Sequence, residues 1–365
     1  MEIKYVEDHT IFECIVGSQA YGTHNELSDF DYAGVMIPGK EYFLGLKNFE
    51  QFQGFENVDK TIYDIRKALT LIADNNPNML DLLFSPERCV IKSTEYWNKI
   101  VENRDMFLSK RIRYTFSGYA SAQLQRIKTH RKFLLNPLKN EPQRSDFGLD
   151  DISIFPTSQI KSVCQAALEL IEETEKPCFI AELDKIHGDY VIPILSKFLA
   201  SKERILAMEW LQQGLKSQSH AFISAGTQYI KDEYIDQARR ELQFYNASSE
   251  WKQYKNWQKT RNKKRADLEA KFGFDTKHLM HLVRLLRMGK ECLLKGELFV
   301  DRTNIDAEEL KEIRNGSWTF DQAEQYTKDQ DKELSELYLT TTLPKSPNRE
   351  AISKLCVEIV DNFLR

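Results

Sequence analysis

The sequence predicts an α+β protein, with a small N-terminal domain of mixed sheet and flanking helices followed by a larger, mostly helical region. Two observations carry this prediction. Residues 11–18, 31–37 and 58–65 have the length and the apolar or alternating pattern of strands, and all three lie within the first ninety residues. After about residue 95 glycine is less frequent, and apolar side chains recur at spacings of three and four.

These patterns suggest a domain of residues 1–95 followed by a helical domain of residues 96–365. Helical spacing begins at Ile65 directly after the third strand, and the Asn-Pro-Asn segment at residues 76–78 breaks this helix before another starts. A polar segment at residues 135–155 is expected to form a loop or linker. Further helices are expected over residues 109–134, 223–272, 276–296 and 351–365.

Composition restricts the class of protein. The chain has 365 residues, a formal net charge of −4 and 29% charged residues, which is ordinary for a globular protein. No apolar run approaches the roughly 20 residues of a membrane span, and the N-terminus lacks the pattern of a secretory signal. The six cysteines are scattered, without the spacing of metal ligands or of a disulfide framework. We therefore expect a cytoplasmic protein with no membrane partner.

Residues 17–35, GSQAYGTHNELSDFDYAGV, combine a glycine turn with two closely spaced aspartates. In an extended segment Asp29 and Asp31 point to the same side, where their charges repel unless a cation compensates them. Mg²⁺ is the natural compensation because it prefers hard oxygen ligands. The turn at Gly17 and Ser18 would bring backbone N–H groups and a hydroxyl to phosphates. This pairing indicates metal-assisted phosphoryl or nucleotidyl transfer, although an Asx-type turn with an exposed Asp31 would give the same short pattern.

The pattern GS-x-AYGT-x4-SD-x-D-x-x-GV resembles the signature of the DNA polymerase β-like nucleotidyltransferase superfamily. Within it, the chain is most similar to the bacterial and phage family of predicted nucleotidyltransferases associated with RNA repair. KTIYDIRKALTLIADNNPNMLDLLF and FDTKHLMHLVRLLRMGKECLLKG carry the similarity further, over the first ninety residues and about residues 270–320, with a weaker match at 109–134. The resemblance implies Mg²⁺-dependent transfer of a nucleoside monophosphate from an NTP to a hydroxyl, with an RNA end, possibly of tRNA, as acceptor.

The resemblance also assigns roles to single residues. Asp29 and Asp31 would hold two Mg²⁺ ions, and the superfamily usually adds a third carboxylate from a neighbouring strand. Asp59 and Asp64 have opposite parity on the predicted third strand, so only one of them faces the metals. Asp59 is preferred because it opens the strand, whereas Asp64 would then cap the following helix. Glu56 is a third candidate.

Several basic residues are candidates for binding the nucleotide. Arg66 and Lys67 follow the third strand and either reach the phosphates or are surface charges. Lys277, His281 and Arg284 lie at i, i+4 and i+7 and therefore share one face of the helix predicted at residues 276–296. We expect this face to close over the metals and contact the triphosphate or the acceptor. A solvated polar face is the alternative.

Residues 251–265, WKQYKNWQKTRNKKR, combine seven lysines or arginines with three large aromatic residues. The aromatic residues repeat every three positions, a pattern typical of nucleic-acid binding, although a helix that packs them into a core fits as well. The segment at residues 109–116 offers a second basic cluster. The candidate nucleic-acid contacts are Lys110, Arg111, Arg113, Trp251, Tyr254, Trp257, Lys263, Lys264 and Arg265.

Three functions stay open at this point. The first is an RNA-directed nucleotidyltransferase, the second is an enzyme that nucleotidylates a protein or small molecule, and the third is a catalytically silent nucleotide-binding module. The intact Gly17-Ser18 turn and the Asp29–Asp31 pair argue against the third, because a silent module has no need for paired metal ligands.

Overall fold

A computed structural model of the chain contains two compact units. The first comprises Met1–Leu135 together with Asn262–Arg365, and the second comprises Asn136–Arg261. The boundary expected after residue 95 does not separate them, because the sheet and the helices on both sides of that residue share one hydrophobic core. The structure describes residues 2–26, 28–56, 58–153, 213, 232–261 and 263–365.

The first unit is built on a five-stranded mixed sheet in the order β3-β4-β2-β1-β5. β1 is antiparallel to both β2 and β5, β2 is parallel to β4, and β3 is antiparallel to β4. The strands predicted from the sequence are present as β1, β2 and β4, whereas the short edge strands β3 and β5 are not among the predicted elements. The strands are β1 (Thr10–Val16), β2 (Asp31–Met36), β3 (Gln51–Phe52), β4 (Asp59–Asp64) and β5 (Val90–Ser93).

Helices make up most of the remaining described structure, so the predicted α+β class is confirmed. None of the helices in the described ranges is long and apolar enough to cross a membrane. The helices of the first unit are α1 (Ile3–His9), α2 (Ser18–Tyr21), α3 (Ile65–Ala73), α4 (Pro77–Leu83), α5 (Glu95–Glu102), α6 (Ile112–Leu135), α13 (Lys263–Phe272), α14 (Thr276–Lys295), α15 (Ala307–Arg314), α16 (Phe320–Thr340) and α17 (Arg349–Phe363). Short 3₁₀ turns are η1 (Lys40–Tyr42), η2 (Glu87–Cys89) and η3 (Arg104–Phe107).

Local sequence explains where the helices beside the sheet begin and end. The Asp64 carboxylate accepts hydrogen bonds from the backbone N–H groups of Arg66 and Lys67 and so caps α3. Asn76 caps α4 in the same way, and Pro77 occupies the first helical position, where no N–H is needed. At the other end of the unit, α14 stops at Gly296, which has φ 71°.

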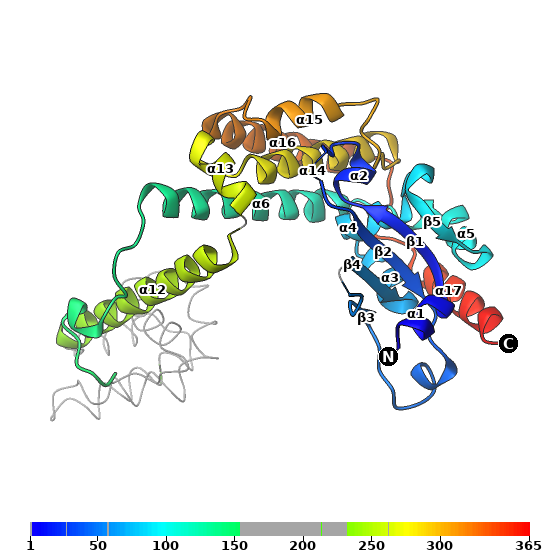
Figure 1. Ribbon diagram of the computed structural model, residues 1–365, viewed down its shortest axis with the longest axis horizontal. Helices are drawn as coiled ribbons and strands as arrows, with labels where there is room; N and C mark the ends of the chain where they lie inside the picture. The colour runs from blue at the N-terminus through cyan, green and yellow to red at the C-terminus, as the bar shows by residue number, and fades with distance from the viewer. Residues whose placement is uncertain (1, 27, 57, 154–212, 214–231, 262) are drawn as a thin grey trace. The chain divides into compact units, whose positions relative to one another are not determined.

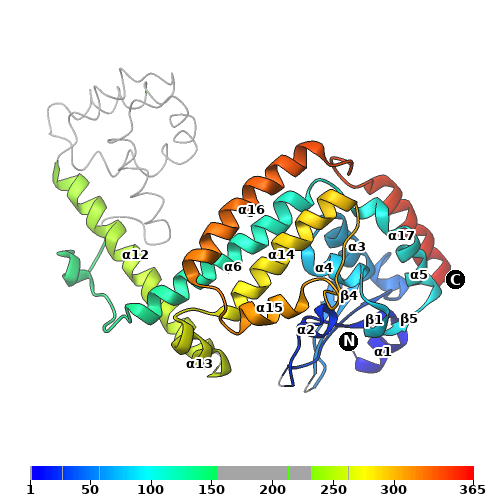
Figure 2. The same ribbon diagram turned by 90° about the horizontal axis from the view of Figure 1, so that it is seen from above.

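α14 lies at the centre of the helical layer, side by side with α6 and α16 (Figures 1 and 2). Its apolar residues Leu279, Leu282, Val283 and Leu286 are buried, as the sequence pattern predicts. They belong to the same core as Val35 of β2, so the helical layer and the sheet are packed as one body.

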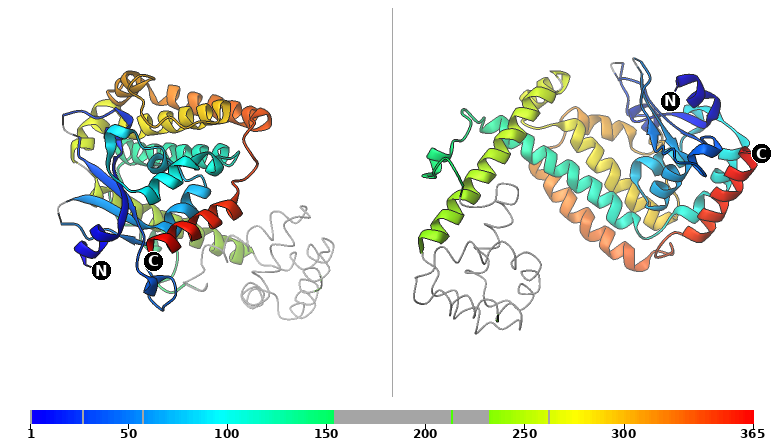
Figure 3. Two further views of the ribbon diagram at one scale, coloured as in Figure 1. Left: turned by 90° about the vertical axis from the view of Figure 1, so that its right-hand side faces the viewer. Right: turned by 90° about the horizontal axis from the view of Figure 1, so that it is seen from below.

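The C-terminal helix returns to the sheet end of the unit. α17 packs against α3 and α5, and the ring of Phe363 lies 6.0 Å from the ring of His9 in α1. The two chain termini therefore lie at the same end of this unit (Figure 3). A smaller cluster of Val6, Met36 and Ile62 covers the opposite face of the sheet.

In the second unit, the described residues form helix α12 (Asp232–Thr260) and the short 3₁₀ turn η4 (Arg144–Phe147). The Arg144 guanidinium donates two hydrogen bonds, of 2.9 and 2.7 Å, to the buried Glu241 carboxylate on α12. The rings of Phe147 and Phe244 also meet, with centroids 5.7 Å apart. η4 is thus fixed to α12 by one ion pair and one aromatic contact.

Two glycines test how tightly α14 packs on α6. A methyl group added at Gly289 would lie 2.9 Å from Cβ of Phe116, whereas one added at Gly118 on α6 would meet no atom within 4 Å. We predict that Gly289→Ala lowers the free energy of unfolding by about 1–3 kcal/mol through overpacking. Gly118→Ala, the matched control, should raise it by up to about 1 kcal/mol through helix propensity. Urea unfolding of both variants measures this, and equal stabilisation by both would contradict the packing.

Candidate functional site

Three side chains form a row across the sheet at one end of its central strands. Asp31 of β2 pairs with Val16 of the antiparallel β1 and with Asp59 of the parallel β4. Directly paired residues on neighbouring strands lie about 4.8 Å apart and point to the same face of the sheet. That face is the one covered by the helical layer, because Val35, two pleats along from Asp31, belongs to the main core. Asp31 and Asp59 are therefore neighbouring carboxylates at the edge of the core.

The environment of Asp31 disfavours its charge. Burial raises the pKa of Asp31 above its ordinary value, and the neighbouring charge of Asp59 raises it further. The Lys277 ammonium on α14 lowers this pKa, and Asp29 raises it. Asp29, Asp59 and Lys277 thus all act electrostatically on Asp31, although they come from three different parts of the chain.

The other candidate carboxylates are placed less centrally. β2 begins at Asp31, so Asp29 lies exposed in the preceding loop and not in a strand next to Asp31. Asp64 lies at the opposite end of β4 from Asp59, is 1% exposed and caps α3, as in the alternative considered for it. Glu56 is exposed in the loop before β4. Of the two candidates on β4, only Asp59 shares the row with Asp31.

The glycine turn lies against this row. Gly17 has φ 70°, in the left-handed region that side chains rarely adopt, and a Cβ at this position would lie 3.1 Å from Oδ2 of Asp31. Ser18 starts α2, and the first N–H groups of a helix have no acceptor within it. Glycine is needed here both for the backbone angle and for space beside the carboxylate.

Residues distant in sequence hold the turn in place, and we call them the turn clamp: Arg88, Asp301, Arg302 and Arg314. Arg88 donates to the backbone carbonyls of Gln19 and Ala20, at 2.9 and 3.0 Å, and to the Asp301 carboxylate at 2.9 Å. This contact lowers the pKa of Asp301 to about 2. Arg88 thus adds a second donor to the Gln19 carbonyl, which also accepts from the Gly22 N–H, and it supplies a donor to the Ala20 carbonyl at the end of this one-turn helix.

Two further contacts complete the turn clamp. The Arg302 backbone N–H donates to the Tyr21 carbonyl at 3.1 Å, and Arg314 donates to the Thr23 carbonyl at 3.4 Å. Gly22 has φ 70°, and a Cβ there would collide with the Thr303 hydroxyl, so glycine leaves room for the segment after α14 to pack on the turn.

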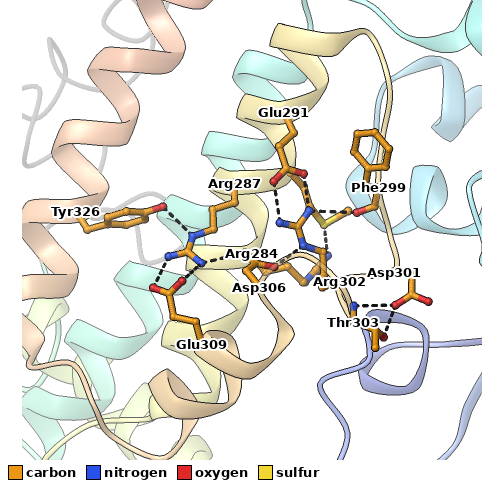
Figure 4. A network of polar contacts seen from close by, with 11 residues as sticks. Arg284, Arg287, Glu291, Phe299, Asp301, Arg302, Thr303, Asp306, Glu309 and Tyr326 are labelled. Carbon is orange, nitrogen blue, oxygen red and sulfur yellow. Dashed lines mark hydrogen bonds and ion pairs between the residues drawn. The ribbon is translucent and has the colours of Figure 1, made fainter.

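A network of buried ion pairs holds Arg302, a member of the turn clamp, in place (Figure 4). The Arg302 side chain is fully buried and donates to Glu291 at 2.5 and 2.8 Å and to Asp306 at 2.7 Å. Arg287 donates to the same Asp306 and to Glu309. Because a buried arginine is costly without its partners, this network fixes the segment that carries Asp301 and Arg302.

The helix face that carries Lys277, His281 and Arg284 lies at the site, as predicted, and is not the solvated polar face of the alternative. Lys277 acts on Asp31, while His281 and Arg284 line a cavity of about 720 Å³ together with Gly17. Arg284 is only 3% exposed, and its guanidinium lies 3.6 Å from the Tyr21 ring centroid.

Asp81 on α4 contacts both Tyr21 and Arg284. Arg284 lies 3.6 Å from the Asp81 carboxylate, which accepts a 2.5 Å hydrogen bond from the Tyr21 hydroxyl. Burial raises the pKa of Asp81, and the charge of Arg284 lowers it. Arg284 is therefore a buried cation held beside the glycine turn.

Arg66 and Lys67 are not brought to the carboxylate row. They follow Asp64, and five strand steps of about 3.3 Å place that end of β4 about 16 Å from Asp59. Arg66 donates to Asp64 at 3.0 Å, and Lys67 donates to Glu50 at 2.7 Å. Their charges are used in local ion pairs at the far end of the sheet.

The candidate nucleic-acid contacts lie in both units. In the first unit, Lys110 lies over the Tyr338 ring, Arg111 pairs with Asp74 and Arg113 pairs with Asp331. These basic residues are thus engaged within the unit.

In the second unit, α12 carries Trp251, Tyr254 and Trp257 as a row of rings with centroids 5.9 and 5.8 Å apart. Tyr254 is 6% exposed, so part of this row is buried, as in the alternative of a core-packing helix. The side chains of Lys263, Lys264 and Arg265 lie outside the described residues.

The residues present fit Mg²⁺ as part of a shared coordination shell. Within the described chain, no three carboxylate, histidine or cysteine side chains gather closely enough to form a metal cage. Mg²⁺ nevertheless requires only one or two carboxylates when waters and substrate phosphates supply the other ligands. Asp31 and Asp59 offer this pair, and their repulsion is the interaction that a divalent cation relieves.

Sequence patterns do not reveal several residues that shape the site. Arg88, Asp301 and Arg302 lie in no local motif, and their role depends on contacts more than 60 residues apart in sequence. Tyr21 is different, because it lies inside the AYGT part of the signature, and Asp81 is a charged residue within the apolar MLDLLF segment. A buried charge in an apolar helix is a signal that the sequence does offer.

The turn clamp can be tested by hydrogen exchange. We predict that Arg88→Ala speeds exchange of the amides of residues 18–23 by roughly tenfold, because two carbonyl hydrogen bonds and one ion pair are lost. Arg88→Lys should recover little, since an ammonium lacks the fork that reaches all three acceptors. Arg104→Ala is the matched control, because Arg104 contacts the Phe84 ring and not the turn. Unchanged exchange in Arg88→Ala would contradict the clamp.

The charge balance at Asp31 predicts opposite effects of two neighbouring substitutions. Asp59→Asn should lower the pKa of Asp31, and Lys277→Ala should raise it further. Carbon-13 NMR titration of the Asp31 carboxyl in metal-free protein measures both, and shifts of the same sign would contradict the arrangement.

The raised pKa of Asp31 determines whether Asp31→Asn stabilises or destabilises the protein at a given pH. The folded protein binds a proton at Asp31 more tightly than the unfolded chain, so above its raised pKa the ionised group costs stability. Asp31→Asn should therefore raise the melting temperature at pH 7.5 and change it little at pH 3.

Comparisons with known proteins concern the part of the chain that holds this site. Residues 2–138 match RlaP, described as an RNA repair pathway DNA polymerase beta family. An uncharacterized 38.9 kDa protein in the nrdC-mobD intergenic region of Enterobacteria phage T4 is 27% identical over 126 residues, which are 31% of this chain and 37% of the phage protein. The match thus spans little more than a third of this relative.

No solved structure gives a significant match to the chain. The similarity expected for residues 270–320 lies outside the family match. Residues 2–138, with the glycine turn and the Asp31–Asp59 row, are therefore the part of this chain that is similar to a polymerase β-like family.

Proposed function

We propose that this protein is a nucleotidyltransferase that moves a nucleoside monophosphate from an NTP to a hydroxyl group. The observation that carries the proposal is the pairing of Asp31 with Asp59 beside a glycine turn, with Lys277 acting on the same carboxylate. Paired carboxylates beside a turn whose first backbone N–H groups have no acceptor within the helix suit metal-assisted transfer to or from a phosphate. The match of residues 2–138 to a polymerase β-like family supports the same reaction class.

The residues of this chain divide the work. Asp31 and Asp59 would hold Mg²⁺, and a second ion would draw on Asp29 in the loop before β2. Bound Mg²⁺ supplies positive charge that neutralises the phosphate oxygens and aligns the reacting groups. Gly17 and Ser18 would bind the β- and γ-phosphates through backbone N–H groups and the serine hydroxyl.

Two cations on α14, Lys277 and Arg284, would also act on the bound phosphates. Lys277 already balances the charge of Asp31, and Arg284 is fixed beside Gly17 in the shared cavity. Both would therefore stabilise phosphate charge that builds up during transfer.

The proposed reaction is an in-line displacement. The acceptor hydroxyl oxygen forms a bond to the α-phosphorus of the NTP, the bond from that phosphorus to the β-phosphate oxygen breaks, and pyrophosphate leaves. The hydroxyl proton passes to a carboxylate, for which Asp59 is the candidate because it is the outermost member of the row.

We propose an RNA end as the acceptor. The description of the matching family as an RNA repair family supports this choice, and the half-buried rings of Trp251 and Trp257 on α12 would supply stacking surfaces. A cytoplasmic setting fits it, because Cys14, Cys89, Cys292 and Cys356, the cysteines that the structure describes, are all free thiols.

A transfer assay tests the proposal. The full-length protein is incubated with Mg²⁺, each of the four NTPs labelled at the α-phosphate, and pools of RNA or of protein. We expect labelled RNA with the wild type and a loss of at least about a hundredfold with Asp31→Asn and with Asp59→Asn. Asp64→Asn is the matched control on the same strand, and it should retain transfer because asparagine can still cap α3.

Each other outcome has a defined meaning. Equal loss of transfer in Asp64→Asn and Asp59→Asn would remove Asp59 from its assigned role. Labelled protein without labelled RNA would replace the RNA acceptor with a protein. Nucleotide binding without any transfer, unchanged by Asp31→Asn, would identify a silent nucleotide-binding module and overturn the proposal.

A further inference from the structure

We propose that the cavity between α4, α6 and α14 is a nucleoside-binding subsite, in which tyrosine rings of α6 stack on the base and Gln123 contacts the edge of the base. This inference rests on the proposed function, because it names what the site holds beyond phosphates. The cavity has a volume of about 720 Å³, within the usual range for small-molecule sites, and all of its lining residues belong to the first unit.

Two aromatic rings on one wall are exposed and already fixed in position. Tyr114 is 60% exposed and Tyr119 is 36% exposed, and both line the cavity. The Tyr119 hydroxyl accepts a 2.7 Å hydrogen bond from Asn76 Nδ2, and the Tyr114 ring packs edge-on against Tyr338 at 5.4 Å. The Arg113 guanidinium lies over the Tyr114 ring, 5.5 Å from its centroid. The Tyr119 ring, which is held through its hydroxyl, is therefore better suited to stacking on a flat heterocycle at little cost in entropy.

Two buried polar atoms in the wall lack partners among the described residues. These atoms are Gln123 Oε1 on α6 and Arg284 Nε on α14. Both atoms are shielded from solvent in this arrangement, so a ligand meets the Gln123 oxygen only when the amide turns it toward the cavity that Gln123 lines. The cost of leaving that oxygen unpaired favours this turn when a donor is offered there, and the amide then presents a donor and an acceptor to the ligand. The edge of a nucleobase carries donors and acceptors side by side, which a phosphate or an aliphatic ligand does not.

The charged residues that line the cavity indicate a ligand with negative charge. Arg126 and Arg284 both line the cavity, and its described lining includes no carboxylate. Gly17 forms part of the same wall and lies against Asp31, so the cavity adjoins the proposed phosphate and metal site. A base in the cavity would thus belong to a nucleotide whose phosphates lie at the glycine turn, or to the terminal nucleotide of an RNA that approaches it.

Calorimetric binding to the full-length protein tests the subsite. The probes are the four NTPs, the four nucleosides and inorganic triphosphate, each with Mg²⁺. We expect Gln123→Leu and Tyr119→Ala to weaken binding of at least one NTP and its nucleoside by about tenfold or more, and to leave inorganic triphosphate unchanged. Tyr119→Phe, which keeps the ring, should stay close to wild type.

The matched control is Gln125→Leu, because Gln125 is exposed on the same helix and is not part of the cavity lining. It should bind every probe as the wild type does. Equal weakening of inorganic triphosphate by Gln123→Leu would overturn the proposal, as would identical binding of all probes by the Gln123→Leu and Gln125→Leu variants. Thermal melting of each variant separates these results from loss of folding.

Kinetic measurements identify the source of the base and separate this inference from the proposed function. A raised KM for the NTP in Gln123→Leu assigns the base to the donor, and a raised KM for the RNA alone assigns it to the acceptor; both support the subsite. Base-dependent binding without any transfer would retain the subsite and reject the transferase. Transfer that depends on Asp31, with both KM values unaffected by Gln123→Leu, would reject the subsite and retain the transferase.

Discussion

The site depends most on the capture of the glycine turn by residues from outside the N-terminal sheet. α2 is a single helical turn, too short to be stable by its own hydrogen bonds. Its carbonyl groups are held by Arg88 and by the Arg302 backbone, and Arg314 holds the Thr23 carbonyl just after it, so the turn has a defined position only when the segment after α14 is packed. This explains why the sheet and the C-terminal helices share one core instead of forming separate domains.

The same packing carries charge into the site. α14 brings Lys277 to Asp31 and Arg284 to Tyr21, so one helix supplies cations at both the carboxylate row and the cavity. Asp31 and Asp59 are held close together at a cost in stability, because burial and repulsion both oppose ionisation of Asp31. Groups that oppose folding and converge on one turn are typical of a binding or catalytic site rather than of a structural ion pair.

The sequence predicts those features that depend on local pattern. Strand periodicity locates β1, β2 and β4, and helical spacing locates α6 and α14. The parity argument separates Asp59 from Asp64, because the side-chain period of a strand is a local property. It does not predict the turn clamp, because residue pairings such as Arg88 with Asp301 depend on how distant segments pack. The expectation that Lys67 reaches the nucleotide phosphates fails for the same reason. Nearness in sequence to a strand does not tell at which end of the sheet a side chain lies, and Lys67 pairs with Glu50 at the far end.

The central claim is that Asp31 and Asp59 form one metal and phosphate site with the glycine turn. A crystal structure of the full-length protein with Mg²⁺ and a non-hydrolysable NTP analogue tests it most directly. The account predicts a metal ion bound to both carboxylates, with the phosphates beside Gly17 and Ser18. A metal and triphosphate bound instead at the Asp64 and Arg66 end of β4, with Asp31 and Asp59 making no contact to either, would contradict it.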